Sequence, residues 1–483
     1  MPTQSQYDVS KQYNRKFKTK ISLLNYQFQM VDELSGDVVG TPSFNIDATS
    51  DIRRTCTISL YPSDTSFNIA FGNKIWLDKY IKVEIGIEDL RTNEVVYTNM
   101  GVYLINNPSR VYSADSNILT FEGLDLMAKL TGLRNGNLEG LEHIIYAGEN
   151  VRETIIDTLA LAGFNRYVCE ECPVLVPNDL RFSSGGTVYD ILRLLANIIP
   201  QYQIYFDVDG VFHYELIPSG ANEQVFVDDD IWTNNLISYQ IDTDFENVKN
   251  SIEVYGKTHE IYLYSTNTTI SGSTYICDCS STINDSLVNN MKIGFVAPSK
   301  VTNPYAQIIV MNTGYEGGTI TLPAKPIKNE DGSFAVLNDA SNVYYVIKYV
   351  ALGDYFLFMG EVTPYAKAEE TNPDSPFYIN GTLGKIRLVL QGGDYDNIYT
   401  SDLALQRAKW ELYNYCRIND SITLNCIPIY WMDVNKVIEI TLPNKQGTEV
   451  TEKYITKQIS TTLDVNGTQS IVAMKYYPYH DTE

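Results

Sequence analysis

Two stretches of similar strand-and-turn pattern lie near the start and at the end of the chain. In the first, apolar and polar residues alternate over 80–85, and further strand-like segments follow up to residue 125. The second stretch begins at 436–440 and continues through 454–459 to 469–474. Alternation with a period of two is typical of strands buried on one face. The pattern favours a duplicated β-rich unit, although the two stretches share no residue-for-residue identity and unrelated β-hairpins also resemble one another.

The composition is that of a large, acidic, tyrosine-rich protein. A length of 483 residues suits about three domains, and the net charge is −23 at pH 7. Because such a protein repels phosphate backbones, its charge argues against a main role in binding nucleic acid. The 36 Tyr and 17 Phe, against only 4 His, are typical of β-rich proteins with large contacts between strands.

The sequence gives no indication of export or of metal binding. No apolar run follows basic residues at the N-terminus, and no stretch approaches the ~20 apolar residues of a membrane span. The pairs Cys169/Cys172 and Cys277/Cys279 suggest a zinc hypothesis, but the second pair has the wrong spacing and neither has a neighbouring His. Seven scattered cysteines are typical of synthesis in a reducing cytoplasm. We therefore expect no metal, no cofactor and no membrane-spanning segment.

The middle of the chain carries local signals for helices and for a hairpin. Asn150 and Glu153 stand at the spacing of a capping box at the start of an amphipathic helix. A second helix follows a Ser/Gly-rich segment and ends at Pro200. Asp209-Gly210 between two β-prone runs predicts a tight hairpin turn. A third helix is predicted over 401–417.

The carboxylates give no convincing catalytic site. The candidates share a turn-like context without a neighbouring His, and acidic turns are their ordinary explanation. They are Asp228–Asp230, Asp242 with Asp244, and Asp394 with Asp396. The hairpin turn accounts for the calcium-like segment Asp207–Gly210, and Gly185–Thr187 lacks the pattern of a phosphate loop. We expect no catalytic residues and no enzyme activity.

Four stretches, taken in order, carry a resemblance to a known family. They are 52–60 with 72–76 leading into 83–85; 121–127; the two-helix unit ending in 205–210; and 403–417 followed by 433–438. The chain resembles the central hub proteins of phage tails and baseplates, a family that includes the amino-terminal part of tail-associated lysins. The resemblance covers about residues 20 to 478. One departure is that Asn435-Lys436 stands where a Gly-Asp pair is expected before the last strands.

The resemblance implies a mainly β fold with α+β parts. Two tube-type β-barrel domains would bracket a small α/β domain and an inserted β-module. The predicted boundaries are an N-terminal arm at 1–20, a first tube-type β-domain at 21–130, the α/β domain at 131–220, a second tube-type β-domain at 221–260 and 381–483, and the inserted β-module at 261–380. Within the arm, the basic side chains of Lys11, Arg15, Lys16, Lys18 and Lys20 suit either a solvated tail or an arm that grips an acidic neighbour.

The same resemblance implies a structural role in a virion. Three copies would form a pseudo-sixfold ring at the tail tip, located between the tail tube and distal fibres or a spike. The implied partners are two further copies of the chain, a distal tail or tail tube protein, the tape-measure protein, and tail fibre or spike proteins. Viral DNA would pass through the ring without specific binding, for which an acidic lumen is suitable.

Two other classes of function remain as alternatives. A virion receptor- or carbohydrate-binding protein would also suit tyrosine-rich β-structure and an inserted module. A glycan-cleaving enzyme would need two carboxyl groups facing each other across a cleft.

Overall fold

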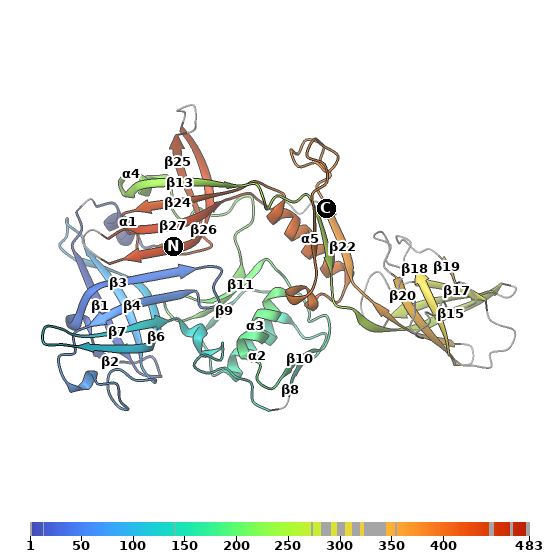
Figure 1. The fold of residues 1–483 in the computed structure, drawn as a ribbon, viewed down its shortest axis with the longest axis horizontal. Coiled ribbons are helices and arrows are strands. Elements are labelled where there is room, and N and C mark those ends of the chain that lie inside the picture. Colours follow the sequence, from blue (N-terminus) through green and yellow to red (C-terminus); the bar gives the residue numbers. More distant parts are fainter. Residues whose placement is uncertain are drawn as a thin grey trace.

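The protein is mainly β, as the sequence predicted, with a few short helices. The computed structural model describes residues 2–12, 14–140, 142–271, 274–281, 291–296, 305–311, 319–322, 344–352, 355–443, 449–463 and 467–479. Figure 1 shows a large sheet at one end of the molecule, a helical part beside it, and a smaller sheet projecting at the other end.

Within the described residues, twelve strands form the largest sheet. Its order is β13 (Leu236–Asp244), β24 (Asn419–Cys426), β27 (Gln469–Lys475), β26 (Glu449–Thr462), β3 (Val38–Asp47), β4 (Arg54–Leu60), β7 (Asn117–Leu124), β6 (Val95–Tyr112), β5 (Tyr80–Glu88), β1 (Phe17–Leu24) and β2 (Met30–Glu33), with β25 (Val437–Pro443) paired to β26.

This sheet contains the same five-strand arrangement twice. The first unit consists of β3 to β7, which lie in the spatial order β3-β4-β7-β6-β5. The second unit consists of β13, β24, β25, β26 and β27, which lie in the corresponding order β13-β24-β27-β26-β25. All neighbouring strands within both units are antiparallel. The predicted duplication is therefore confirmed, and it includes two strands more than the sequence indicated.

Each unit buries the apolar face of its strands in its own core. In β4 every second side chain is buried, namely those of Arg54, Cys56, Ile58 and Leu60. The core of the first unit collects buried side chains from β1 and from β3 to β7. The core of the second unit is built around Ile422, Leu424, Ile438, Ile459 and Ile471. Fully burying such a side chain stabilises the fold by roughly 1.5–3 kcal/mol.

The predicted small α/β domain contains two helices and two small sheets. Its elements are β8 (Glu142–Ile145), α2 (Val151–Leu161), β9 (Tyr167–Cys169), β10 (Leu180–Ser183), α3 (Val188–Asn197), β11 (Tyr202–Phe206) and β12 (Phe212–Leu216). The Asn150 side chain accepts a hydrogen bond from the Glu153 N–H, which confirms the predicted helix start. Gly210, with φ +69°, occupies the hairpin turn between β11 and β12, because glycine adopts this backbone conformation without strain.

A separate small layer connects the large sheet to the projecting one. It consists of β14 (Ser251–Tyr255), β22 (Tyr365–Glu369), β23 (Arg387–Leu390) and helix α5 (Ser401–Tyr415). The apolar face of α5 packs on β14 and β22 through Ala404 and Ala408, together with Ile252 and Val254. β22 lies inside the predicted inserted module 261–380, but it pairs with β14.

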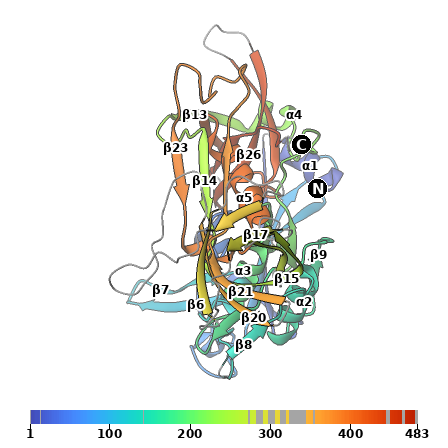
Figure 2. The same cartoon turned by 90° about the vertical axis from the view of Figure 1, so that its right-hand side faces the viewer.

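The projecting sheet has seven strands within the described residues. They are β15 (His259–Ser271), β16 (Thr274–Ser281), β17 (Met291–Val296), β18 (Tyr305–Met311), β19 (Thr319–Leu322), β20 (Tyr344–Leu352) and β21 (Tyr355–Val362). Figure 2 views the molecule from this end, with the seven-stranded sheet in front of α5 and the α/β part. An inserted module of strands was predicted for this region; the domain boundaries themselves remain predictions.

The N-terminal arm contains regular structure and contacts the rest of the chain. Helix α1 (Gln4–Ser10) starts at a capping box formed by Thr3 and Gln6, and its Val9 side chain is buried. The guanidinium of Arg15 donates a hydrogen bond to Asn235 Oδ1 at 2.6 Å. The expectation of a solvated tail is therefore wrong, because short-range capping and burial of Val9 hold the segment in place.

Short helices complete the structure. They are α4 (Asp229–Asn235) and the 3₁₀ helices η1 (Ser35–Asp37), η2 (Thr65–Phe67), η3 (Leu126–Lys129) and η4 (Gly393–Asn397). Among the described residues, no helix is long and apolar enough to cross a membrane.

Candidate functional site: the junction of the two units

The two units are joined by direct strand pairing. Strand β26 of the second unit pairs antiparallel with β3 of the first, over Gln458–Thr462 and Ser43–Asp47. Ile459 stands opposite Ile46, and both side chains are buried. The junction is therefore a continuation of the sheet, with its apolar face continuous from one unit to the next.

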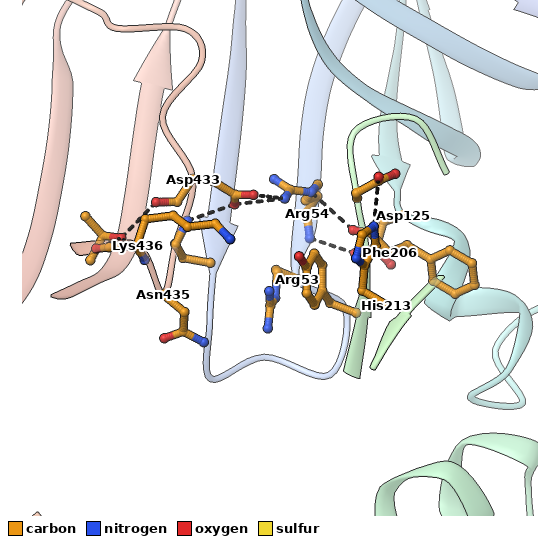
Figure 3. Close-up of polar contacts among 12 residues, drawn as sticks. Arg53, Arg54, Asp125, Phe206, His213, Asp433, Asn435 and Lys436 are labelled. Carbon is orange, nitrogen blue, oxygen red and sulfur yellow. Dashed lines mark hydrogen bonds and ion pairs between the residues drawn. The ribbon is translucent and has the colours of Figure 1, made fainter. Parts of the chain in front are cut away.

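A buried ion pair links the units beside this strand pair. Arg54 at the start of β4 is fully buried, and its Nη2 lies 2.8 Å from both carboxylate oxygens of Asp433, in the connection before β25. Its Nε donates to the carbonyl oxygen of Phe206 at 3.3 Å. Figure 3 shows Arg54 between Asp433 and Asp125, with the α/β part close by. The guanidinium of Arg54, a residue of the first unit, thus contacts both the second unit and the α/β part.

The carboxyl of Asp125 lies on the other side of this arginine. It accepts hydrogen bonds from the backbone N–H groups of Arg54 and Met127, both at 2.9 Å. Burial raises the pKa of Asp125 to about 6, although these hydrogen bonds and the two neighbouring arginines act in the opposite direction. For Arg54, the attraction of Asp433 outweighs burial and raises the pKa of the guanidinium, which therefore stays charged.

A second set of polar contacts stabilises the junction beside the ion pair of Arg54 and Asp433. Gln203 Oε1 accepts hydrogen bonds from Arg53 at 2.8 Å and from Asn435 Nδ2 at 2.7 Å. The Arg53 guanidinium also lies 4.0 Å from the ring centroid of Tyr205, a cation–π geometry. Lys457 donates to Asn435 Oδ1 at 2.9 Å. Burial, with the nearby charges of Arg417 and Arg53, lowers the pKa of Lys457 to about 8.

The departure from the expected Gly-Asp pair has a structural explanation at this junction. Asn435 has φ +53°, a left-handed conformation that glycine adopts freely and asparagine tolerates. Its side chain is buried and bonded to Gln203 and Lys457. Asparagine therefore satisfies the backbone requirement and adds two contacts that glycine cannot make.

His213 of the α/β part lies beside two carboxylates, which sequence reasoning missed. Its Nε2 lies 3.0 Å from Asp207 and its Nδ1 lies 3.5 Å from Glu215, while its ring stacks on Tyr205. Burial opposes protonation, but the hydrogen bond to Asp207 and the attraction of both carboxylates outweigh it and raise the pKa of His213 to about 9. The i, i+2 spacing of His213 and Glu215 on a strand was the available signal. These contacts hold His213 of β12 against Asp207 at the hairpin turn and against Glu215 of its own strand.

The first group of acidic residues considered as catalytic candidates, Asp228–Asp230, is used in structural contacts. Asp228 and Asp230, at the start of α4, bind Tyr7 and Lys11 of the arm. Their neighbour Asp229 accepts a hydrogen bond from the Thr441 N–H. The arm therefore contacts acidic residues of its own chain through Tyr7 and Lys11, and a grip on an acidic neighbouring protein stays a prediction.

The other acidic candidates are dispersed. Asp242 accepts from Gln240, Asp244 accepts from the Glu246 N–H in a turn, and Asp394 pairs with Arg193 at 2.7 Å. Among the described residues, no group of three or more metal-binding side chains comes together. Cys169 and Cys172 are free thiols; the side chains of Cys277 and Cys279 lie outside the described part.

Comparisons with known proteins agree with this architecture. A family model described as a domain of unknown function, DUF5048, matches residues 374–480. A search of curated protein sequences finds no match. The prophage MuSo2 43 kDa tail protein from Shewanella oneidensis is similar in structure, with a TM-score of 0.50 and 9% identity over 95% of this chain and 98% of that one. The chain therefore has the fold of a phage tail protein.

Two further solved structures resemble the chain less closely in TM-score. A tail protein from Neisseria meningitidis MC58 gives a TM-score of 0.48 with 11% identity, covering 95% of this chain and 96% of that one. The Francisella PdpA-VgrG complex gives a TM-score of 0.43 with 10% identity, covering 97% of this chain and 54% of that one.

Proposed function

We propose that the protein is a structural hub of a phage tail tip. Three copies form a ring in which each chain supplies two equivalent wall segments, its first and second units. The ring joins the tail tube to distal fibre or spike components and leaves a channel for DNA and the tape-measure protein. It carries out no catalysis.

The repeat of five strands within one sheet is the observation that carries this proposal. Two units of the same strand order, joined side by side, place two similar wall segments at neighbouring positions of one sheet. A closed assembly of three such chains has six equivalent positions, so it matches a sixfold tube while remaining a homotrimer. The fold shared with a prophage tail protein supports the same conclusion.

The net charge is compatible with a conduit. At −23 per chain, three chains would repel DNA from most of their surface, so that DNA passes without being retained. The inserted seven-stranded sheet projects away from the large sheet (Figure 1). That position leaves it available for contact with another tail component.

The experiment is a measurement of mass by light scattering, with negative-stain images of the same peak. We expect a particle of three times 54.6 kDa with a central hole, and retention on purified tail tube ends. A globular monomer at all accessible concentrations, combined with specific glycan binding, would replace the hub with a receptor-binding function.

A further inference from the structure

The two units differ in what lies beside their first strands. In the first unit, β3 is paired with β4 on one edge and with β26 on the other. In the second unit, β13 is paired with β24 on one edge, and among the described residues no strand covers its other edge. The strand order makes β13 the equivalent of β3. The edge of β13 is therefore open, whereas the equivalent edge of β3 is paired with β26 of the same chain.

The registers identify equivalent residues in the two units. Tyr80 and Val437, which begin β5 and β25, pair with Leu104 and Ile455. In the first unit, the paired residues lead from β6 across β7 and β4 to β3. In the second unit, they lead from β26 across β27 and β24 to β13. Matching these two paths step by step makes Phe44 of β3 the equivalent of Ile241 of β13.

Burial at these equivalent positions differs sharply. Phe44, in the strand that β26 pairs with, is 2% exposed in the core of the first unit, whereas Ile241 is 46% exposed. Ile241 stands opposite the fully buried Ile422, so it lies on the core-facing side of the sheet. Tyr239, two residues earlier, faces the same way and is 38% exposed. The apolar face of the second unit thus continues, uncovered, to its edge.

Strand β13 also lacks the usual protection of an exposed edge. Natural edge strands are commonly protected by Lys, Pro or a bulge that turns the edge away. The sequence of β13, Leu236–Asp244, contains neither Lys nor Pro, and its bulge lies at one end, between Leu236 and Ser238. An uncovered strand of nine residues with apolar side chains is suited to pairing with another strand.

The first unit presents a matching free edge at the end of β6. The pairing of β6 with β5 stops at Leu104, whereas its pairing with β7 continues to Tyr112. In the second unit, the equivalent part of β26 pairs with β27 on one edge and with β3 on the other. The end of β6 therefore lacks, within the described chain, the partner that its counterpart has. Tyr112 at this end is 79% exposed.

We infer that β13 of one copy pairs antiparallel with the end of β6 of the next copy, in the register of the β26–β3 junction. In that junction Asn45 stands opposite Ser460, and Phe44 opposite Thr461. Replacing each of these residues by its equivalent in the other unit places Asp242 of one copy opposite Ser109 of the next, and Ile241 opposite Arg110. The same register places Tyr239 opposite Tyr112.

The faces of the two strands agree in this register. Arg110 pairs with Leu119, which is fully buried, so Arg110 and Tyr112 lie on the core-facing side of β6. Ile241 and Tyr239 lie on the core-facing side of β13, as described above. A shift of one residue would place them on opposite faces. The pair Tyr239–Tyr112 would bring two exposed aromatic rings into cross-strand contact.

This contact uses different surfaces on the two copies, so it repeats head to tail. The assembly closes into a ring of three copies when each copy is rotated by one third of a turn relative to the previous one. The inference rests on the proposed function, because it specifies the contact that would close the ring. It adds the two strands, their register and the residues opposite one another.

Pairs of introduced cysteines test the register. The double variant Ser109→Cys/Asp242→Cys places thiols opposite one another between copies, about 5 Å apart at Cβ, and a short bifunctional thiol reagent should convert most of the protein to covalent trimer. The control Ser109→Cys/Ile241→Cys has its second thiol on the other face of the sheet. The single variants and the unchanged protein measure the background from native cysteines.

The outcomes separate the inference from the function. Covalent trimer in the Ser109/Asp242 pair at ten or more times the yield of the control supports the register. A trimer by light scattering that cross-links equally in both pairs, or in neither, overturns the register and leaves the hub intact. Absence of any trimer overturns the inference, and the test of glycan binding described above then decides whether the proposed function is replaced.

Discussion

The two units of the large sheet share a strand order but draw on the chain differently. The first unit takes its five strands from the continuous segment 38–124, whereas the second takes β13 from 236–244 and the rest from 419–475. Residues 245–418 between them contain the three-stranded layer and the projecting sheet. A long insertion between two paired strands costs little free energy, since loop-closure entropy grows slowly with length. The comparison shows that side-chain pattern and register determine the sheet order, rather than proximity along the chain.

The largest effect is expected at the contact that joins the units. Asp433→Ala leaves the fully buried Arg54 without its carboxylate, so we expect the free energy of unfolding to fall by about 3–5 kcal/mol. Denaturant unfolding followed by tryptophan fluorescence measures it. The double variant Arg54→Met/Asp433→Leu, which removes both charges, should recover most of the loss; equal losses in the single and double variants would contradict this account.

Equivalent residues in the two units should respond differently. Phe44→Ala removes a buried ring, and we expect a loss of about 3–5 kcal/mol in the isolated chain. Ile241→Ala removes a half-exposed side chain, and we expect a loss below about 1 kcal/mol under the same conditions. The two variants are compared by denaturant unfolding at low protein concentration. Similar losses would show that the edge of β13 is already covered within one chain.

A pH dependence should distinguish the α/β part from both units. The pKa of His213 is about 9 in the folded protein, against about 6.5 when unfolded. The folded state therefore binds the extra proton, and the stabilisation is complete below pH ~6.5 and is lost as pH rises through about 9. Comparison of the protein with His213→Asn should show a difference of roughly 1–3 kcal/mol that vanishes at high pH. A difference independent of pH would reject the charged imidazole.

The smallest effect is expected where the arm meets the second unit. Lys11 and Asp230 are 3.2 Å apart, and the Asp230 side chain is largely exposed. Asp230→Asn should change the free energy of unfolding by less than about 1 kcal/mol. Val9→Ala, which removes a buried side chain of the same arm, should cost more. Proteolysis of the first 16 residues would report detachment in either variant.

Local features of the fold were predictable from the sequence. Strand alternation marked the meanders β5–β7 and β25–β27, and capping residues marked α2. The dipeptide Asp209-Gly210 marked a hairpin. Each of these signals lies within a few residues, where backbone preference and side-chain periodicity act directly. The capping box of Thr3 and Gln6 is an equally local signal for α1.

The junction was beyond such reasoning. Arg54 and Asp433 are 379 positions apart, and nothing in their neighbouring residues indicates the pairing. Arg54 occupies one of the buried positions of the alternating strand β4, so the sequence pattern does not distinguish it from the apolar core residues beside it. Likewise, the pairing of β13 with β24 bridges a large insertion. Contacts of this kind depend on the assembled sheet and have no periodic signature along the chain.

The divided second unit has a consequence for the order in which the protein is made. All strands of the first unit leave the ribosome before β13, and β13 leaves it long before β24, its partner. At roughly 5–20 residues per second, β3 and β13 each wait with an open edge until the C-terminal strands emerge. Unpaired edges are the surfaces at which nascent chains aggregate or exchange strands. The protein should therefore depend on chaperones during synthesis more than its stability would indicate, with truncation before β24 yielding insoluble chains.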